Sequence, residues 1–274
     1  MSNKTLSIII TVYGKTELLK LCIDSIQRNI SNNLDYEIIV ASSATEESAY
    51  DLMRETFPNI TFIPNKENKG FGFVANQGIE KSTGEYLFLI NHDIIIKGPA
   101  IQKLLEFIKN DKTVGVVSPK LINFDGKTQP SAFKFYSWRT IIYRRTFLGK
   151  FSFAKKYLNK FLLQEKLASG KVIDVDWVMG SAIMTSREAV DKVGKFDKNF
   201  FMYFEDVDWC RRFWENNYRV VYNPAVTVAH YHGKASGNKG VIQAILLNKY
   251  TRIHIKSAII YFWKYLWKKN PHIE

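Results

Sequence analysis

Three short polar clusters in the sequence hold side chains that could do chemistry, and each lies at the end or the start of a hydrophobic segment. They are Asn91-His92-Asp93, Glu205-Asp206-Val207-Asp208 and His230-Tyr231-His232. Proteins hold Mg²⁺ or Mn²⁺ with one or two carboxylates while substrate phosphates complete the coordination. A carboxylate can also act as a general base. Singly, each cluster could be a turn, a helix cap or a surface feature, so their joint occurrence carries the functional interpretation.

The first 124 residues alternate between strand-like and helix-like segments. Apolar, β-branched runs predict strands at 6–12, 36–41, 60–64, 85–91 and 114–118. Helical spacing of apolar residues predicts helices at 16–30, 46–56, 74–81 and 99–108. This order predicts an α/β fold with a mostly parallel, mixed sheet flanked by helices. Because ligands bind beyond the carboxyl ends of such strands, we expect the site at the loops 11–15, 42–47 and 91–93.

After residue 124 the pattern changes. The segment 133–166 is basic and aromatic and lacks a strand period, so we interpret it as a partly helical insertion. A strand is expected at 174–185, a short helix from Ser186 to Gly194 and a helix at 206–216. Two further strands are expected at 219–222 and 226–230. The acidic cluster would then open a helix, where the helix dipole should keep its carboxylates ionised at neutral pH.

The net charge of +13 is concentrated in two aromatic segments, 133–166 and 234–274. Basic, aromatic surfaces suit an anionic membrane, because aromatic rings sit well at headgroup depth. A solvated basic face is the alternative. Nucleic acid is not an expected partner, since no nucleic-acid motif is present and the charge lies outside the expected sheet crevice. No uninterrupted apolar run reaches the roughly 18–20 residues needed to span a bilayer, and the nearest, 258–267, is short and broken by Lys264, so it could lie on a membrane but not cross it.

The two cysteines, Cys22 and Cys210, form no spacing motif and are interpreted as small core residues. Residues 1–4 lead directly into a strand-like run without a signal-peptide pattern. We therefore expect a cytoplasmic protein that is peripheral on the inner face of the cytoplasmic membrane.

Beyond these patterns, the sequence carries a family resemblance. The segment from Asn68 to Asp93, NKGFGFVANQGIEKSTGEYLFLINHD, resembles family 2 glycosyltransferases, in which an N-x-G segment and an Asn precede a strand that ends in a metal-binding Asp. The runs DWVMGSAIMTSREAVDKVGKFDKNFFMYFEDVDWCRR and YRVVYNPAVTVAHYHGKAS are similar to the bacterial rhamnosyltransferase-like branch of that family. The resemblance covers about residues 6–236. It implies a GT-A type fold, a nucleotide-diphosphate sugar donor, Mg²⁺ or Mn²⁺, and inverting transfer to a lipid-linked or polysaccharide acceptor in bacterial surface glycan synthesis.

The resemblance also implies roles for individual residues. Asp93 and His230 would bind the metal, and Asp206 would be the catalytic base. The implied substrate-binding residues are Thr11, Tyr13, Ser42, Asn68, Gly70, Asn76, Asn91, His92, Trp177, Gly180, Glu205 and Asp208. Among these, Asn68, Gly70 and Asn76 match the loop and helix near the donor, and Trp177 and Gly180 fall in the region that shapes the sugar and acceptor pocket.

Two positions depart from the family pattern. Ser42 stands where relatives usually have the acid that recognises the nucleobase, and Thr11 stands where many have proline. Ser42 could still bond the base, or Glu46 or Glu47 could compensate. At Asn91 and His92 a second metal-binding carboxylate is missing. These departures motivate a second hypothesis, a catalytically silent homologue that serves as a binding or scaffolding subunit.

Two parts of the chain are expected. Residues 1–236 would form the catalytic domain, and 237–274 a basic, aromatic C-terminal helical extension that associates with a membrane. The alternative for this extension is a helix that packs against the catalytic domain, because aromatic stripes more often serve a core.

Overall fold

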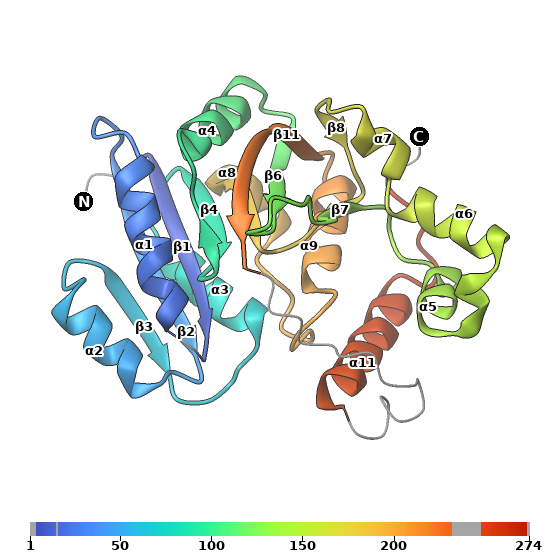
Figure 1. The fold of residues 1–274 in the computed structure, drawn as a ribbon, viewed down its shortest axis with the longest axis horizontal. Coiled ribbons are helices and arrows are strands. Elements are labelled where there is room, and N and C mark those ends of the chain that lie inside the picture. The colour runs from blue at the N-terminus through green and yellow to red at the C-terminus, as the bar shows by residue number, and fades with distance from the viewer. Residues whose placement is uncertain (1–3, 15, 232–247, 273–274) are drawn as a thin grey trace.

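The computed structural model describes residues 4–14, 16–231 and 248–272. Its centre is one twisted sheet with helices on both faces (Figure 1). Within the described residues the strands of this sheet follow the order β3-β2-β1-β4-β10-β6-β11-β5, and β8 pairs with β11. Their bounds are β1 Leu6–Tyr13, β2 Tyr36–Ser43, β3 Thr61–Asn65, β4 Tyr86–Asn91, β5 Ile94–Ile95, β6 Val114–Ile122, β8 Ile173–Asp174, β10 Ala182–Ser186 and β11 Arg219–His230.

The sheet is mixed and mostly parallel, as expected. Strands β1 to β4 run in parallel, with Ile9 of β1 opposite Ile39 of β2 and Leu89 of β4. Strand β10 is antiparallel to both of its neighbours, β4 and β6, and β11 is parallel to β6. Consequently β1, β2, β4 and β11 end at the same edge of the sheet, and β10 begins there.

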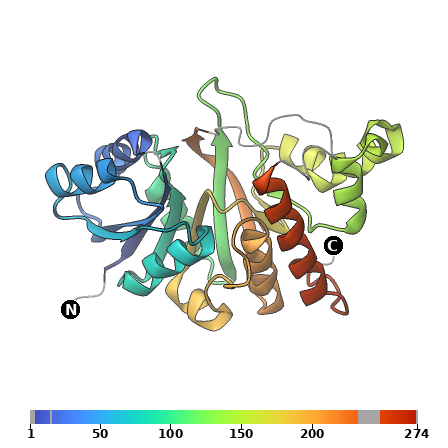
Figure 2. The ribbon, with the colours of Figure 1, turned by 90° about the horizontal axis from the view of Figure 1, so that it is seen from below.

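The helices cover the two faces of the sheet, which Figure 2 shows from the side. Helices α1 (Glu17–Asn29), α2 (Glu47–Glu55) and α4 (Ala100–Asn110) pack on one face with the side chains of Ile8 and Ile10. Helices α3 (Phe71–Lys81), α8 (Arg187–Val193) and α9 (Glu205–Glu215) pack on the other face with Ile9. Because strand side chains alternate, one β-branched run supplies both cores.

The segment expected as one strand, 174–185, is divided into three. Its middle piece, β9 (Trp177–Val178), leaves the main sheet and pairs with β7 (Ala132–Phe133) in a two-stranded ribbon. The chain then turns through Gly180 and returns as β10. Conversely, the two strands expected at 219–230 form the single strand β11, which is irregular between Asn223 and Thr227. There Pro224 offers no N–H, and the Asn223 side chain accepts from Ala225 N instead.

The insertion is largely helical, with α5 (Trp138–Arg145), the 3₁₀ helix η1 (Phe147–Lys150), α6 (Ser152–Phe161) and α7 (Gln164–Ala168). The C-terminal helix α11 (Lys249–Lys264) packs its Ala258 and Tyr261 into the core that contains α9. The alternative of a packed helix therefore holds for α11. The expected boundary at 236/237 and His232 lie outside the described residues. In the part of the chain described, no helix combines the length and apolar character that crossing a membrane requires.

Candidate active site

The polar clusters meet at the edge where the parallel strands end. Asp93 lies in the tight connection from β4 to β5, and β5 pairs with β11 so that His230 is opposite Ile94. The backbone N–H of Tyr231 donates to Asp93 O at 2.9 Å, which ties the ends of the two strands together. As a result, residues 137 positions apart in sequence lie in contact.

Asp93 and His230 are arranged as two ligands of one cation would be. His230 Nε2 lies 3.4 Å from Asp93 Oδ1, His230 is buried, and Asp93 Oδ1 is buried without a hydrogen-bond partner. A buried carboxylate oxygen that receives no hydrogen bond is costly unless a cation is nearby. These residues therefore fit a divalent metal.

Gln129 sets the orientation of the His230 ring. Gln129 Nε2 donates to Asn123 Oδ1 and, at 3.0 Å, to the backbone oxygen of His230. These bonds direct Gln129 Oε1 toward His230 Nδ1, at 2.8 Å. The proton of the neutral ring then lies on Nδ1, and Nε2 presents its lone pair toward Asp93. Across the described ranges, no group of three or more His, Cys, Asp or Glu side chains is gathered as a metal cage. Two protein ligands leave room for substrate phosphates.

A cavity of about 300 Å³ opens directly beside this pair. The expected site residues that line it are Thr11, Tyr13, Asn68, Gly70, Asn91, His92, Asp93, Gly180, Glu205 and Asp206. Thr11 Oγ1 donates to Asn91 Oδ1 at 3.0 Å, so the ends of β1 and β4 are joined at its floor. Burial lowers the pKa of His92, which favours its neutral form.

Gly70 is required by the shape of this cavity's wall. Its φ is +86°, and a Cβ atom there would lie 1.9 Å from Phe201 O. The side-chain oxygen Oδ1 of Asn68, two residues earlier, accepts a hydrogen bond from Gly70 N at 3.0 Å, which holds the turn into α3. Only glycine has both the backbone freedom and the space that this contact needs.

Asp206 is fixed by two backbone donors at the start of α9. Gly180 N donates to its Oδ2 at 3.1 Å and Val207 N to its Oδ1 at 2.9 Å. Burial raises the pKa of Asp206 to about 6, although these hydrogen bonds lower it. Asp206 is therefore mostly ionised at pH 7 and can accept a proton.

Glu205 behaves differently from the expectation that the helix dipole keeps it ionised. Its Oε2 is buried without a partner, and burial, followed by the charge of Asp206, raises its pKa well above the usual range. Desolvation thus outweighs the helix dipole at this carboxyl. The two residues before it, Tyr203 and Phe204, both have left-handed backbone, with φ of +68° and +67°. Such conformations store strain and occur at functional sites.

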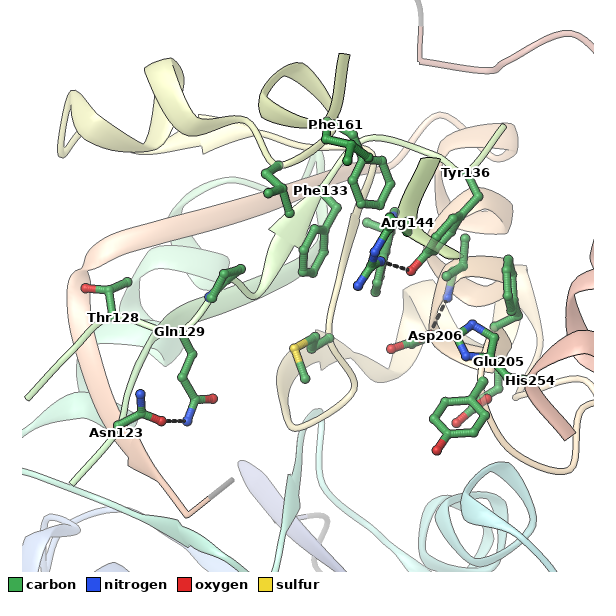
Figure 3. A pocket seen from close by; sticks show the side chains of 18 residues that line it. Asn123, Thr128, Gln129, Phe133, Tyr136, Arg144, Phe161, Glu205, Asp206 and His254 are labelled. Carbon is green, nitrogen blue, oxygen red and sulfur yellow. Dashed lines mark hydrogen bonds between the residues drawn. The ribbon is translucent and has the colours of Figure 1, made fainter. Parts of the chain in front are cut away.

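A second, larger cavity of about 680 Å³ adjoins the first (Figure 3). Its wall is aromatic: Phe133 and Trp177 stack at 4.4 Å between ring centroids. Arg144 lies in this cavity and donates to the hydroxyl of Tyr136 at 2.9 Å. Four residues line both cavities: Met179, Tyr203, Glu205 and Asp206. Asp206 therefore stands at the junction of two spaces.

Some expected site residues do not line either cavity. Ser42 is buried, and its neighbour Ser43 lines the smaller cavity instead. The side-chain amide of Asn76 makes two hydrogen bonds with the backbone of Phe196: Asn76 Nδ2 donates to Phe196 O, and Phe196 N donates to Asn76 Oδ1, each at 2.9 Å. The Asn76 amide is thus used within the fold, whereas Ser42 Oγ is buried without a hydrogen-bond partner, and the expected contact of Ser42 with the nucleobase stays a prediction.

Asp208, also expected to contact substrate, is fully buried between α9 and α11. Its carboxylate accepts from Arg212 Nε at 2.9 Å and Tyr265 Oη at 2.8 Å and pairs with Lys264 Nζ at 2.6 Å. We assign Asp208 to the junction of the two helices, because its oxygens are already used there.

The sequence patterns did not identify several cavity residues. Arg144 and His254 lie outside the quoted motifs, Met179 and Tyr203 lie within one of them without having been singled out, and the chain brings the four residues to the cavities from four different segments. The unusual aromatic content of the insertion was the available signal for the second cavity.

The fold is shared with known glycosyltransferases. It resembles GalNAc-T7 with UDP, GalNAc and Mn²⁺, with a TM-score of 0.64 and 14% identity, over 92% of this chain and 48% of that chain. It also resembles the mannosyltransferase PcManGT from Pyrobaculum calidifontis in complex with GDP-Man and Mn²⁺, with a TM-score of 0.58 and 16% identity, over 99% and 78% of the two chains. The fold is GT-A, as expected.

The family model described as Glycosyl transferase family 2 matches residues 7–169, and the chain belongs to this family. It is 24% identical over 241 residues to N-acetylglucosaminyl-diphospho-decaprenol L-rhamnosyltransferase of Mycobacterium tuberculosis (strain H37Rv), covering 83% of this chain and 76% of that protein. It is 26% identical over 266 residues to rhamnosyltransferase WbbL of Escherichia coli (strain K12), covering 93% and 91%. The expected likeness to rhamnosyltransferases is confirmed.

The buried Glu205 carboxyl predicts a pH-dependent stability. Its pKa is raised on folding, so ionisation destabilises the protein as the pH rises through the folded-state pKa. Glu205→Gln should therefore raise the melting temperature at pH 8 by about 2–4 °C, the shift that ~1 kcal/mol produces in a domain of this size. The gain should shrink toward pH 5, where the wild-type carboxyl is increasingly protonated. Glu106→Gln, at an exposed position of α4, is the control. An equal gain at pH 5 and pH 8 would show that ionisation is not the cause.

Proposed function

We propose that this protein transfers a sugar, with inversion, from a nucleoside-diphosphate sugar to a hydroxyl of a lipid-linked or polysaccharide acceptor in bacterial surface glycan synthesis. Rhamnose is the proposed sugar, because two of the relatives that match over most of the chain are rhamnosyltransferases by name. The observation that carries the proposal is the position of Asp206 between two cavities. One of these adjoins the Asp93–His230 pair, and the other is walled by aromatic rings.

The smaller cavity suits the donor. Asp93 and His230 offer an oxygen and a nitrogen ligand at 3.4 Å from one another, and the two similar glycosyltransferase structures named above hold Mn²⁺ with a nucleotide or nucleotide sugar. A divalent cation bound there would neutralise the charge that grows on the leaving diphosphate. Gly70 lines the wall of this cavity, and Thr11 and Asn91 supply polar atoms at the floor.

The larger cavity suits the acceptor. Its wall offers aromatic surface to the C–H groups of a sugar, and Arg144 provides a polar contact along the wall. In the transfer, the acceptor oxygen bonds to the anomeric carbon while the bond to the diphosphate oxygen breaks. Asp206 accepts the hydroxyl proton, and the nucleoside diphosphate leaves on the opposite side. Gly180 N and Val207 N hold the carboxylate in place for this step.

A peripheral position on the cytoplasmic face of a membrane is part of the proposal. The exposed fractions of Trp263 and Trp267 are 74% and 93%, and Lys268 and Lys269 follow directly. Exposed indole rings beside lysines favour an anionic bilayer surface, where a lipid-linked acceptor would be found.

The first prediction of the proposed function concerns the metal. Asp93→Ala should abolish Mn²⁺-dependent binding of a nucleoside diphosphate, and His230→Ala should weaken it. Gln129→Ala should lower the affinity by about 10–100-fold, because the His230 ring loses its orienting partner. Calorimetric titration of UDP, GDP and dTDP with Mn²⁺ would measure this, with exposed Asp125→Asn as the control. Unchanged affinity in both ligand variants would remove the metal assignment.

The second prediction concerns the base. Asp206→Asn should lower the transfer rate by about 10²–10⁴-fold or more, while donor affinity changes little. In the wild type, kcat/KM should fall as the pH drops below about 6, because protonation of Asp206 removes the proton acceptor. Transfer rate and donor affinity should be measured together.

Asp208→Asn is the matched control for Asp206→Asn. It should melt at a lower temperature, because Arg212 and Lys264 lose part of their anionic partner, yet its rate should fall less. Near-normal transfer by Asp206→Asn, or a larger rate loss in Asp208→Asn, would move the base elsewhere. Donor hydrolysis with added Mn²⁺ separates an enzyme from a silent homologue, since the latter would release no nucleoside diphosphate.

The third prediction concerns the membrane. The wild type should float with anionic liposomes at low salt, and high salt should weaken binding because lysine charges are screened. Replacing Trp263 and Trp267 together with serine should reduce flotation, whereas serine at the exposed Leu21 of α1 should not. Absence of wild-type binding at low salt would end the membrane proposal.

A further inference from the structure

The C-terminal helix α11 is held firmly against the element that carries Asp206. Ser257 Oγ donates to Met202 O at 2.8 Å, just before α9 begins. Tyr261 is buried in the shared core, and Tyr265 Oη donates to the buried Asp208. The guanidinium of Arg211 lies 4.0 Å from the centroid of the Tyr265 ring. α11 and α9 therefore form one platform.

The first half of α11 reaches the larger cavity. Tyr250 lies near Tyr13 at the end of β1, and the interaction with that phenol raises the pKa of Tyr250. The His254 ring stacks on Tyr203 at 4.7 Å between centroids and 21° between planes, and meets Phe204 at 5.5 Å. His254 lines the larger cavity together with Asp206, and Figure 3 shows it beside Glu205.

We propose that His254 is a substrate-contacting residue of the acceptor site, which hydrogen-bonds a sugar hydroxyl adjacent to the one that attacks. This inference rests on the proposed function, since it assigns the larger cavity to the acceptor. Stacking on Tyr203 covers a face of the imidazole, whereas the ring nitrogens lie in the plane of the ring and outside the stack. His254 and Asp206 line the same cavity, so the proposal places the acceptor sugar between them, with one hydroxyl at Asp206 and an adjacent one at His254.

The location of His254 makes it a determinant of selectivity. The family model matches residues 7–169, so α11 lies outside the matched segment. The proposed metal ligands, Asp93 and His230, come from strand ends of the sheet. Among the described residues, α11 contributes a lining residue, His254, to the proposed acceptor cavity and none to the donor cavity. A hydrogen bond to a sugar hydroxyl discriminates well, since an acceptor without that hydroxyl leaves the polar group unpaired.

A purely supporting role would also explain the ring stack, since His254 packs on two residues with left-handed backbone. Two variants separate the roles. His254→Phe keeps an aromatic ring on Tyr203 but removes the hydrogen bond, and His254→Ala removes both. Lys256→Ala, at an exposed position two residues further along the same helix, is the control.

The test uses the full chain, nucleotide sugars with Mn²⁺, and octyl glycosides of N-acetylglucosamine, glucose and galactose as acceptors. Monodeoxy derivatives of the best acceptor complete the set. For His254→Phe we expect kcat/KM for the acceptor to fall by about 2–12-fold, the effect of one hydrogen bond, with donor hydrolysis unchanged. The deoxy acceptor that lacks the hydroxyl bonded by His254 should be used equally well by wild type and His254→Phe, because neither enzyme can form that hydrogen bond with it.

Wild-type kinetics of His254→Phe with every acceptor would overturn the inference. So would an equal loss of donor hydrolysis and transfer in both variants, which is the signature of a supporting role. A wild type that neither hydrolyses nor transfers any nucleotide sugar would overturn the proposed function, and the inference with it. Normal transfer by His254→Phe leaves the proposed function intact, so the two failures are distinguishable.

Discussion

The site depends on the hydrogen bond from Gly180 N to the Asp206 carboxylate. Gly180 lies in the turn through which the chain leaves the β7–β9 ribbon and enters β10, the antiparallel strand at the centre of the sheet. This one contact therefore connects the sheet edge, the aromatic ribbon and the N-terminus of α9. The space beside it is tight, since a Cβ on Gly180 would lie 3.2 Å from the Phe71 ring. Any movement of the ribbon would move the proposed base as well.

The acidic start of α9 is maintained against an electrostatic and conformational cost. Glu205 and Asp206 are adjacent carboxyls in a poorly solvated place, and Tyr203 and Phe204 before them are both in the left-handed region. The surrounding structure compensates through packing and through the pairing of Asp208 with Arg212 and Lys264 on the far side of the helix. Three acids within one turn thus have separate roles, because their environments differ although their sequence positions are close.

The sequence predicted the sheet and the residues of the smaller cavity better than those of the larger cavity. Local apolar patterns determine strands such as β1 and β4, and strand ends converge in any parallel sheet, so Asp93 could be placed without coordinates. The break at Gly180 could not be predicted, because it depends on the pairing of β9 with the distant β7. The role of Asp208 depends on Tyr265, 57 positions later, and no local pattern encodes that contact. His254 was missed for the same reason.

The pairing of Asp208 with α11 has a consequence for the order of events during synthesis. A chain emerges from the ribosome N-terminus first, so the sheet and α9 can form while α11 is still absent. Until Lys264 and Tyr265 arrive, two of the three partners of the Asp208 carboxylate are missing, and the apolar surface that Tyr261 later covers stays open to water. Maturation of the cleft is thereby delayed until α11 has been synthesised and has packed against α9.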